Sequence, residues 1–152
     1  MTSHEIPLEW LPTLPRRYAA TVVDGLLVIA AMVAPTALWP SDASLGRIIR
    51  VAVAVCALFV YEPLCTGHFL TVGQRITGVR VRRFDTGARI GVPRAYGRIV
   101  VKAFLGFISF LVLPFTRGRR ALHDMATGSI VIMATAEPAF VEWTKTGSGA
   151  SV

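Results

Sequence analysis

Two long apolar stretches dominate the pattern of hydrophobic and polar positions along the chain. Residues 18–39 contain one charged residue, Asp24, and residues 48–65 carry charges only near their ends, at Arg50 and Glu62. About 18 mainly apolar residues are enough for a helix to cross the hydrocarbon core of a bilayer. The pattern therefore predicts two membrane-spanning helices.

A third apolar stretch, residues 98–116, is shorter in its charge-free part, which runs only over residues 103–115. Segments of about 10–14 apolar residues are more typical of core, interfacial or re-entrant pieces than of spans. Two alternatives stay open for this segment, a full crossing and a re-entrant one.

The connection between the second and third stretches is polar and rich in Gly and Arg. Apolar and basic residues alternate over Val79–Arg82, as in a short strand, and the sequence Asp85-Thr86-Gly87 is typical of a turn. We predict a short cytoplasmic β-like hairpin here. A second β-like run lies at Ile130–Ile132. The fold class expected is an all-α integral membrane protein with this small β insertion.

These patterns divide the chain into three parts. Residues 1–13 form an N-terminal flank, residues 14–136 a membrane domain, and residues 137–152 a tail that we expect to be disordered because it ends in Gly and Ser.

Composition and charge agree with a membrane location. Only 16% of the residues are charged and 53% are apolar, whereas roughly a quarter of the residues in an ordinary soluble domain are charged. The net charge of +7 would suggest a nucleic-acid partner in a soluble protein, but here the basic residues lie between the apolar stretches. Nine Lys and Arg residues fall in residues 1–17 and 66–98, against two in residues 40–50. The positive-inside rule then places the N-terminus in the cytoplasm, in a multi-pass arrangement, and no nucleic-acid partner is expected.

Cysteine and histidine positions give no sign of a metal site, a cofactor or catalysis. Cys56 and Cys65 lie nine residues apart on one predicted helix, and His4, His68 and His123 are scattered. Although His123 precedes an aspartate, adjacency in sequence does not supply a nucleophile within reach. We expect neither a cofactor nor enzymatic activity.

The first span holds the most informative charged residue. Asp24 follows Arg17 by seven residues, so the two lie on nearly the same helix face, about 10 Å apart along the axis. A carboxyl group in a bilayer is costly unless it is paired, wetted or protonated, and such groups commonly mark functional paths. Buried polar contacts also hold helices together, so a purely structural role for Asp24 is the alternative.

Other charges near the predicted spans need partners as well. Glu62 lies near the inner end of the second span, where we expect an ion pair with an arginine. Arg94, Arg98 and Lys102 are spaced by four residues and form one cationic stripe. Its anionic partners are expected to be Asp24, Glu62 or the anionic headgroups of the lipid bilayer.

Three separated motifs together resemble the RDD family of small bacterial membrane proteins. They are RYAATVVD at residues 17–24, TVGQRITGVRV at residues 71–81 and RALHDMATG at residues 120–128. In the second motif, Gln74 departs from the basic residue common in the family. The resemblance implies that Arg17, Asp24 and Asp124 are the family's arginine and two aspartates. It also implies about three membrane segments, a location in the bacterial inner (plasma) membrane, and transport of an unknown ligand.

Two hypotheses for function follow. In the first, a cluster of Arg17, Asp24 and Asp124 near the cytoplasmic side binds an ion or small polar solute, and a homo-oligomer or a larger membrane partner completes the path. In the second, the same contacts lock the bundle of a non-catalytic accessory or scaffold subunit. The supporting residues expected in either case are Glu62, Arg75, Arg80, Arg98 and His123.

Overall fold

The computed structural model describes residues 6–38, 44–105, 108–116 and 119–146. The longer elements are α1 (Leu14–Leu38), α2 (Ser44–Cys56), the π-helix η2 (Ala57–Tyr61), α3 (Glu62–His68), α4 (Val72–Thr77), β1 (Val79–Arg83), α5 (Gly91–Leu105), α6 (Ile108–Leu111), α7 (Leu122–Ala126), β2 (Ser129–Met133) and α8 (Glu137–Lys145). Three short 3-10 helices complete the list: η1 (Leu8–Trp10), η3 (Leu113–Phe115) and η4 (Ala134–Ala136).

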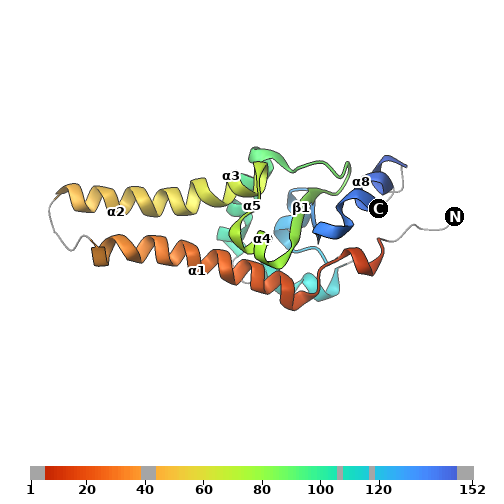
Figure 1. Ribbon diagram of the computed structural model, residues 1–152, viewed down its shortest axis with the longest axis horizontal. Helices are drawn as coiled ribbons and strands as arrows, with labels where there is room; N and C mark the ends of the chain where they lie inside the picture. Colours follow the sequence, from red (N-terminus) through yellow and green to blue (C-terminus); the bar gives the residue numbers. More distant parts are fainter. Residues whose placement is uncertain (1–5, 39–43, 106–107, 117–118, 147–152) are drawn as a thin grey trace.

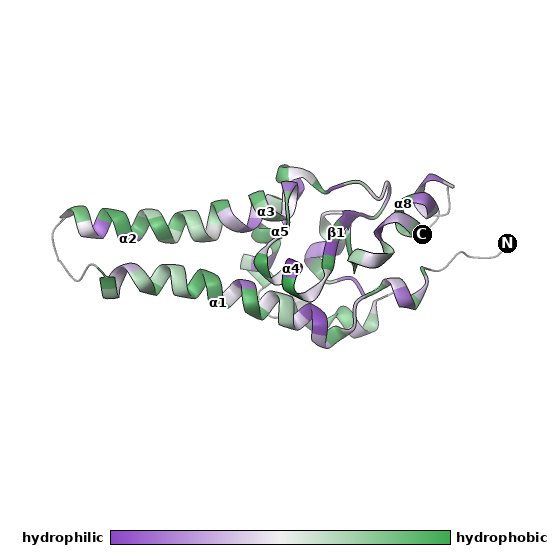
Figure 2. Cartoon of the chain, in the orientation of Figure 1, coloured by the Kyte–Doolittle hydropathy of each residue, from purple (hydrophilic) through white to green (hydrophobic). Residues whose placement is uncertain are grey.

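A helical hairpin projects from the rest of the molecule. One arm is α1, and the other is the continuous helix α2–η2–α3, which runs beside it (Figure 1). Two helical stretches, Leu8–Leu38 and Ser44–His68, are long and apolar enough to cross a membrane. Apolar colouring along both arms is plain in Figure 2. The two predicted spans are therefore found as candidate membrane helices, although Trp39, the predicted end of the first, lies outside the described residues.

The third apolar segment gives no candidate span in the described residues. Over the described part of residues 98–116, the end of α5 is followed by α6 and η3, and in the described ranges no third helix is long and apolar enough to be a candidate span. Two features of the described residues are unfavourable for a span. Arg98 and Lys102 on α5 point toward carboxylates inside the protein, and Pro114 lies in the 3-10 turn η3, where it removes a backbone donor.

The sheet differs from the predicted local hairpin. Strand β1 pairs antiparallel with β2, from Val79 opposite Met133 to Arg83 opposite Ser129. After the turn, the chain returns to β1 only as an isolated bridge between Arg82 and Arg89. The distant strand is the better partner because its side chains are apolar, and Ile130 is fully buried. Such cross-strand packing stabilises a sheet more than a polar neighbour does.

The C-terminal tail, predicted to be disordered, is instead helical over its first part. Residues Glu137–Lys145 form α8, whose Phe140 is fully buried and stacks on Trp143 with ring centroids 5.8 Å apart. One apolar cluster on the sheet consists of Leu11, Ile130, Ile132 and Phe140. Another contains Ala20, Val79, Val81, Ile90, Ala95 and Val131. We call residues 72–146 the cap, because they form the compact end of the molecule from which the hairpin projects (Figure 1).

Candidate functional site

Asp124 lies at the centre of a buried charge cluster that joins three elements. Its side chain is fully buried. It forms ion pairs with Arg17 of α1 at 2.5 Å and with Arg98 of α5 at 2.7 Å. Asp124 also accepts a hydrogen bond from the backbone N–H of Ala121 at 3.1 Å, which fixes the first turn of α7. These contacts attach the base of the hairpin to the cap.

Arg17 and Arg98 favour the charged form of the Asp124 carboxyl group. Burial alone would raise the pKa of Asp124, but Arg98 and Arg17 outweigh that effect and hold the pKa well below its usual range. Both arginines are themselves buried, with 5% of Arg17 and 6% of Arg98 exposed. The cluster therefore holds two cations and one anion away from bulk water. Arg17 and Arg98 find further acceptors in the carbonyl oxygen of Arg119 and the hydroxyl of Ser129.

His123 is buried beside Asp124, and its imidazole is neutral. Its Nδ1 lies 2.7 Å from the hydroxyl oxygen of Ser109, and 1% of the residue is exposed. Burial lowers the pKa of His123 to about 2, despite the opposing charge of Asp124. The ring thus connects α6 to α7 and carries no charge near neutral pH.

Asp24 occupies a different environment from the one that the Arg17 spacing suggested. It accepts hydrogen bonds from the Thr71 hydroxyl at 2.6 Å, the Gly73 backbone N–H at 2.8 Å and the Tyr61 hydroxyl at 3.4 Å. In the described parts of the chain, no Lys or Arg forms an ion pair with Asp24. Arg17 is instead drawn to Asp124. The predicted cluster of three is therefore split into two neighbouring sites.

The sequence around α4 explains how Asp24 is held. Thr71 caps the N-terminus of α4 by accepting a hydrogen bond from the Gln74 backbone. A Cβ at Gly73 would overlap the carbonyl oxygen of Ala20 and lie 2.9 Å from the Asp24 carboxylate. Only glycine lets the two helices approach this closely. The TVGQ sequence thus docks α4 on α1, a role of Thr71 and Gly73 that the sequence reasoning missed.

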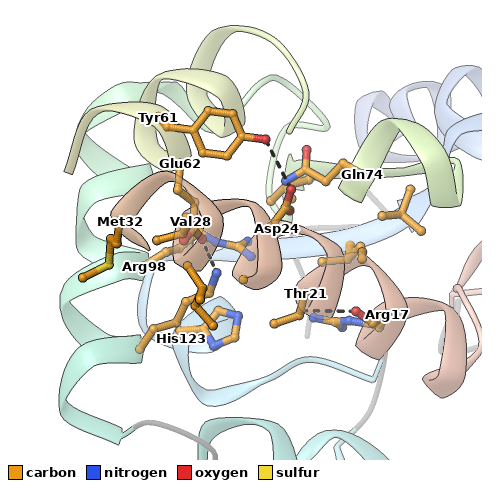
Figure 3. Close-up of a pocket in the computed structure, with 17 residues that line it drawn as sticks. Arg17, Thr21, Asp24, Val28, Met32, Tyr61, Glu62, Gln74, Arg98 and His123 are labelled. Carbon is orange, nitrogen blue, oxygen red and sulfur yellow. Dashed lines mark hydrogen bonds and ion pairs between the residues drawn. The ribbon is translucent and has the colours of Figure 1, made fainter. Parts of the chain in front are cut away.

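A cavity of about 380 Å³ opens at the junction of hairpin and cap. Its wall includes Asp24 from α1, Tyr61 and Glu62 from the second arm, Arg98 from α5 and His123 from α7 (Figure 3). Apolar side chains of α1 complete the wall toward the hairpin. Pockets of this size, mainly apolar with a few convergent polar groups, are typical of small-ligand sites.

The remaining predicted residues are divided between the cavity and the surface. Glu62 forms its ion pair with Lys102 rather than with an arginine. Arg80 pairs with Glu137 of α8 at 3.0 Å, away from the cavity, and Arg75 is exposed on α4. Over the part of the chain that the structure describes, no group of three His, Cys, Asp or Glu residues could hold a metal ion.

Two long apolar helices joined at one end to a polar cap by buried charges define the class, which is that of a small helical membrane protein. Comparison with models of protein families matches residues 11–128 to the RDD family. The chain belongs to the RDD family, a family of membrane proteins. The matched region contains Arg17, Asp24 and Asp124. No curated protein and no solved structure matches the chain.

Proposed function

We propose that this protein binds a small cation, or a polar solute with a cationic group, in the junction cavity and takes part in its transport. The observation that carries the proposal is the position of Asp24 and the partners of its carboxylate. Its carboxylate lies on the cavity wall and is held by hydroxyl and backbone donors, with no ion pair to a basic side chain in the described residues. A carboxylate in low-dielectric surroundings is stabilised by a nearby cation, which a bound ligand would supply.

The proposal includes an assembly of several chains. Two candidate spans expose their apolar faces, with 60% of Leu26 and 62% of Val51 accessible, and two helices are too few to enclose a polar path. A homo-oligomer or a larger membrane partner completes the path in this proposal. No chemical transformation of the ligand is part of it.

The location that we propose is the bacterial inner membrane, with the N-terminal flank and the cap in the cytoplasm. The contact between Arg17 and Asp124 supports a common side for both, because a chain that returns to its starting side has crossed an even number of times. The two arms of the hairpin supply two crossings. The excess of Lys and Arg in residues 1–17 and 66–98 favours the cytoplasmic side.

A second candidate function, an accessory or scaffold subunit, is favoured by the Asp124 cluster. Arg17, Arg98 and Asp124 are buried and satisfied by one another. That arrangement locks the hairpin to the cap without needing a ligand.

Flux through the purified protein distinguishes the two candidates. The protein is reconstituted in vesicles, and uptake of radiolabelled sodium, rubidium and methylammonium is measured for the parent and for Asp24→Asn. Asp85→Asn is the matched control, since Asp85 is exposed and pairs with Arg83 on the surface. Transport predicts uptake that is lost in Asp24→Asn and kept in Asp85→Asn. Uptake no faster than in protein-free vesicles, or equal in both variants, would overturn the transport proposal in favour of the scaffold.

A further inference from the structure

Helix α5 is amphipathic, but its charged face is turned inward and its apolar face outward, the reverse of a surface helix on a soluble protein. Its inner face carries Arg98, of which 6% is exposed, and Lys102, which pairs with Glu62. Its outer face carries Val100 and Phe104, which are 52% and 86% exposed. A helix at a protein surface in water normally places its apolar side against the core and its charges outward.

The apolar outer face continues beyond α5. Exposed apolar residues recur at intervals of three or four in α5, α6 and η3. Together they form what we call the outer stripe: Tyr96, Val100, Phe104, Ile108, Leu111 and Phe115. Phe115, at its far end, is 88% exposed. Contiguous apolar surface of this kind marks a site of contact with a membrane or a protein.

Exposing these side chains to water would be unfavourable. Removing large apolar side chains from water is favourable, and the outer stripe contains several of them unburied. Meanwhile the charges that water would solvate are turned inward, to Asp124 and Glu62. Both sides of α5 therefore indicate that the medium outside it is apolar.

The position of α5 at the base of the hairpin indicates that this apolar medium is lipid. The helix packs against α3, where the second candidate span ends, and runs across the base of the hairpin rather than along it (Figure 1). The exposed apolar surface of the second arm, including Phe59 and Leu64, leads toward this base. The outer stripe therefore lies on a helix that packs beside the end of a candidate span, whose apolar surface faces lipid in a membrane protein.

Charge argues against a span through α5. Gly91–Leu105 carries Arg94, Arg98 and Lys102, and charged side chains at the centre of a bilayer are costly. Helices with one apolar face and low overall hydrophobicity lie in the plane of the interface, with the apolar face in the acyl chains.

We propose that the outer stripe is a lipid-binding surface, on which α5 and α6 lie in the plane of the membrane at the boundary between headgroups and acyl chains, on the side of the cap. The third apolar segment then rests on one leaflet and closes the base of the hairpin from that side. This inference goes beyond the proposed function, because it depends on the exposed face of α5 and not on Asp24.

Depth measurements on single spin labels test the proposal. In a Cys56→Ala, Cys65→Ala background, one cysteine replaces Val100, Phe104, Ile108 or Leu111, all exposed positions where a label displaces no packing. The full chain is reconstituted in vesicles of phosphatidylcholine and phosphatidylglycerol. Accessibility to oxygen is compared with accessibility to a water-soluble nickel chelate. Leu26 on α1 is the deep reference, and Glu142 on α8 is the aqueous reference.

The proposal predicts that all four stripe positions report a similar, shallow depth. Their ratio of oxygen to chelate accessibility should be several-fold higher than at Glu142 and lower than at Leu26. Depth that increases steadily from position 100 to position 111 would show a crossing and overturn the proposal. Chelate accessibility equal to that of Glu142 would also overturn it, since the stripe would then face water. Low accessibility to both reagents would indicate a protein partner instead of lipid and would overturn it too. Each of these results is independent of whether Asp24 binds a cation.

Discussion

Asp24 and Asp124, both near the junction of hairpin and cap, are held by different kinds of partner. Asp124 is enclosed between the guanidinium groups of Arg17 and Arg98 and has no exposed surface. Asp24 lies on the cavity wall and is held by the Thr71 hydroxyl and the Gly73 backbone. The resemblance makes both residues aspartates of the family, but their surroundings differ.

The surroundings of the two carboxylates indicate what each contributes. A buried carboxylate with two cations is already compensated, so its removal would leave two uncompensated charges in the interior. A carboxylate held by neutral donors keeps its charge available to a ligand. The first arrangement suits assembly of the fold, and the second suits binding. Four experiments test this contrast, from the largest expected effect on stability to the smallest.

Asp124→Asn should have the largest effect. The substitution leaves Arg17 and Arg98 buried beside each other without their shared anion. Breaking a buried ion pair by removing one partner costs about 3–5 kcal/mol. We expect a large fall in the unfolding midpoint in detergent and in the amount of folded protein in membranes. Asp85→Asn, which removes an exposed pair with Arg83, should change stability by less than about 1 kcal/mol. Equal stability of the two variants would contradict the assembly role of Asp124.

Acid should weaken the Asp124 side of the junction through His123. Folded protein keeps this ring neutral down to a pKa of about 2, while the unfolded chain takes up a proton near pH 6.5. The unfolded state therefore binds more protons as the pH falls below about 6.5, and stability decreases by up to about 1.4 kcal/mol per pH unit.

The carboxyl group of Asp124 should not add to this loss. Its depressed pKa keeps its stabilising effect present above the unfolded value, and that effect disappears only as pH falls through the lower, native value. Unfolding measured between pH 7 and pH 5 should show the dependence in the parent and in His68→Gln, which changes an exposed histidine. His123→Asn should flatten it, and an unchanged slope in that variant would rule out His123 as its source.

A methyl group at Gly73 should disturb the Asp24 side. The added Cβ would overlap the Ala20 carbonyl oxygen and press on the Asp24 carboxylate, and overpacking of this kind costs about 1–3 kcal/mol. Gly25 is the matched control, because a Cβ there meets nothing within 4 Å. Gly25→Ala should be neutral or stabilising by up to about 1 kcal/mol, since alanine favours helix. Thermal unfolding of both variants checks the difference, and similar melting temperatures would show that α4 does not need its close approach to α1.

Asp24→Asn should have the smallest effect on stability. An asparagine oxygen can still accept the hydrogen bond from the Gly73 N–H, so we expect a loss of about 1 kcal/mol. Abundance in membranes and the unfolding midpoint are the measurements. A loss as large as that of Asp124→Asn would remove the contrast between the two aspartates and give Asp24 a structural role.

Sequence patterns located the hairpin because a long apolar stretch is a local signal. The second candidate span, Ser44–His68, agrees with the predicted residues 48–65 to within a turn at each end, whereas the first helical stretch begins at Leu8, ten residues before the predicted start. Three separated motifs were enough to indicate the family. The third segment was ambiguous for a physical reason. Whether Arg98 is buried or solvated depends on Asp124, and no local pattern reports that contact.

The partners of buried charges could not be predicted from spacing. Arg17 and Asp24 share a helix face, but each is drawn to a distant segment, α7 in one case and the start of α4 in the other. The partner of β1 was missed in the same way, because β2 lies beyond the intervening helical elements α5, α6, η3 and α7. The apolar run of β2 and the aromatic side chains of Phe140 and Trp143 were the available signals for an ordered C-terminal part.

The ion pair between Arg17 and Asp124 also sets an order of events during synthesis. The two residues are 107 positions apart, so at about 5–20 residues per second the ribosome makes Asp124 roughly 5–20 seconds after Arg17. During that interval both arms of the hairpin have been made, while Arg17 and Arg98 still lack their shared anion. The charge cluster therefore closes only after both arms of the hairpin have been made. A chain interrupted between residues 98 and 124 would retain two arginines without the anion that pairs them in the fold.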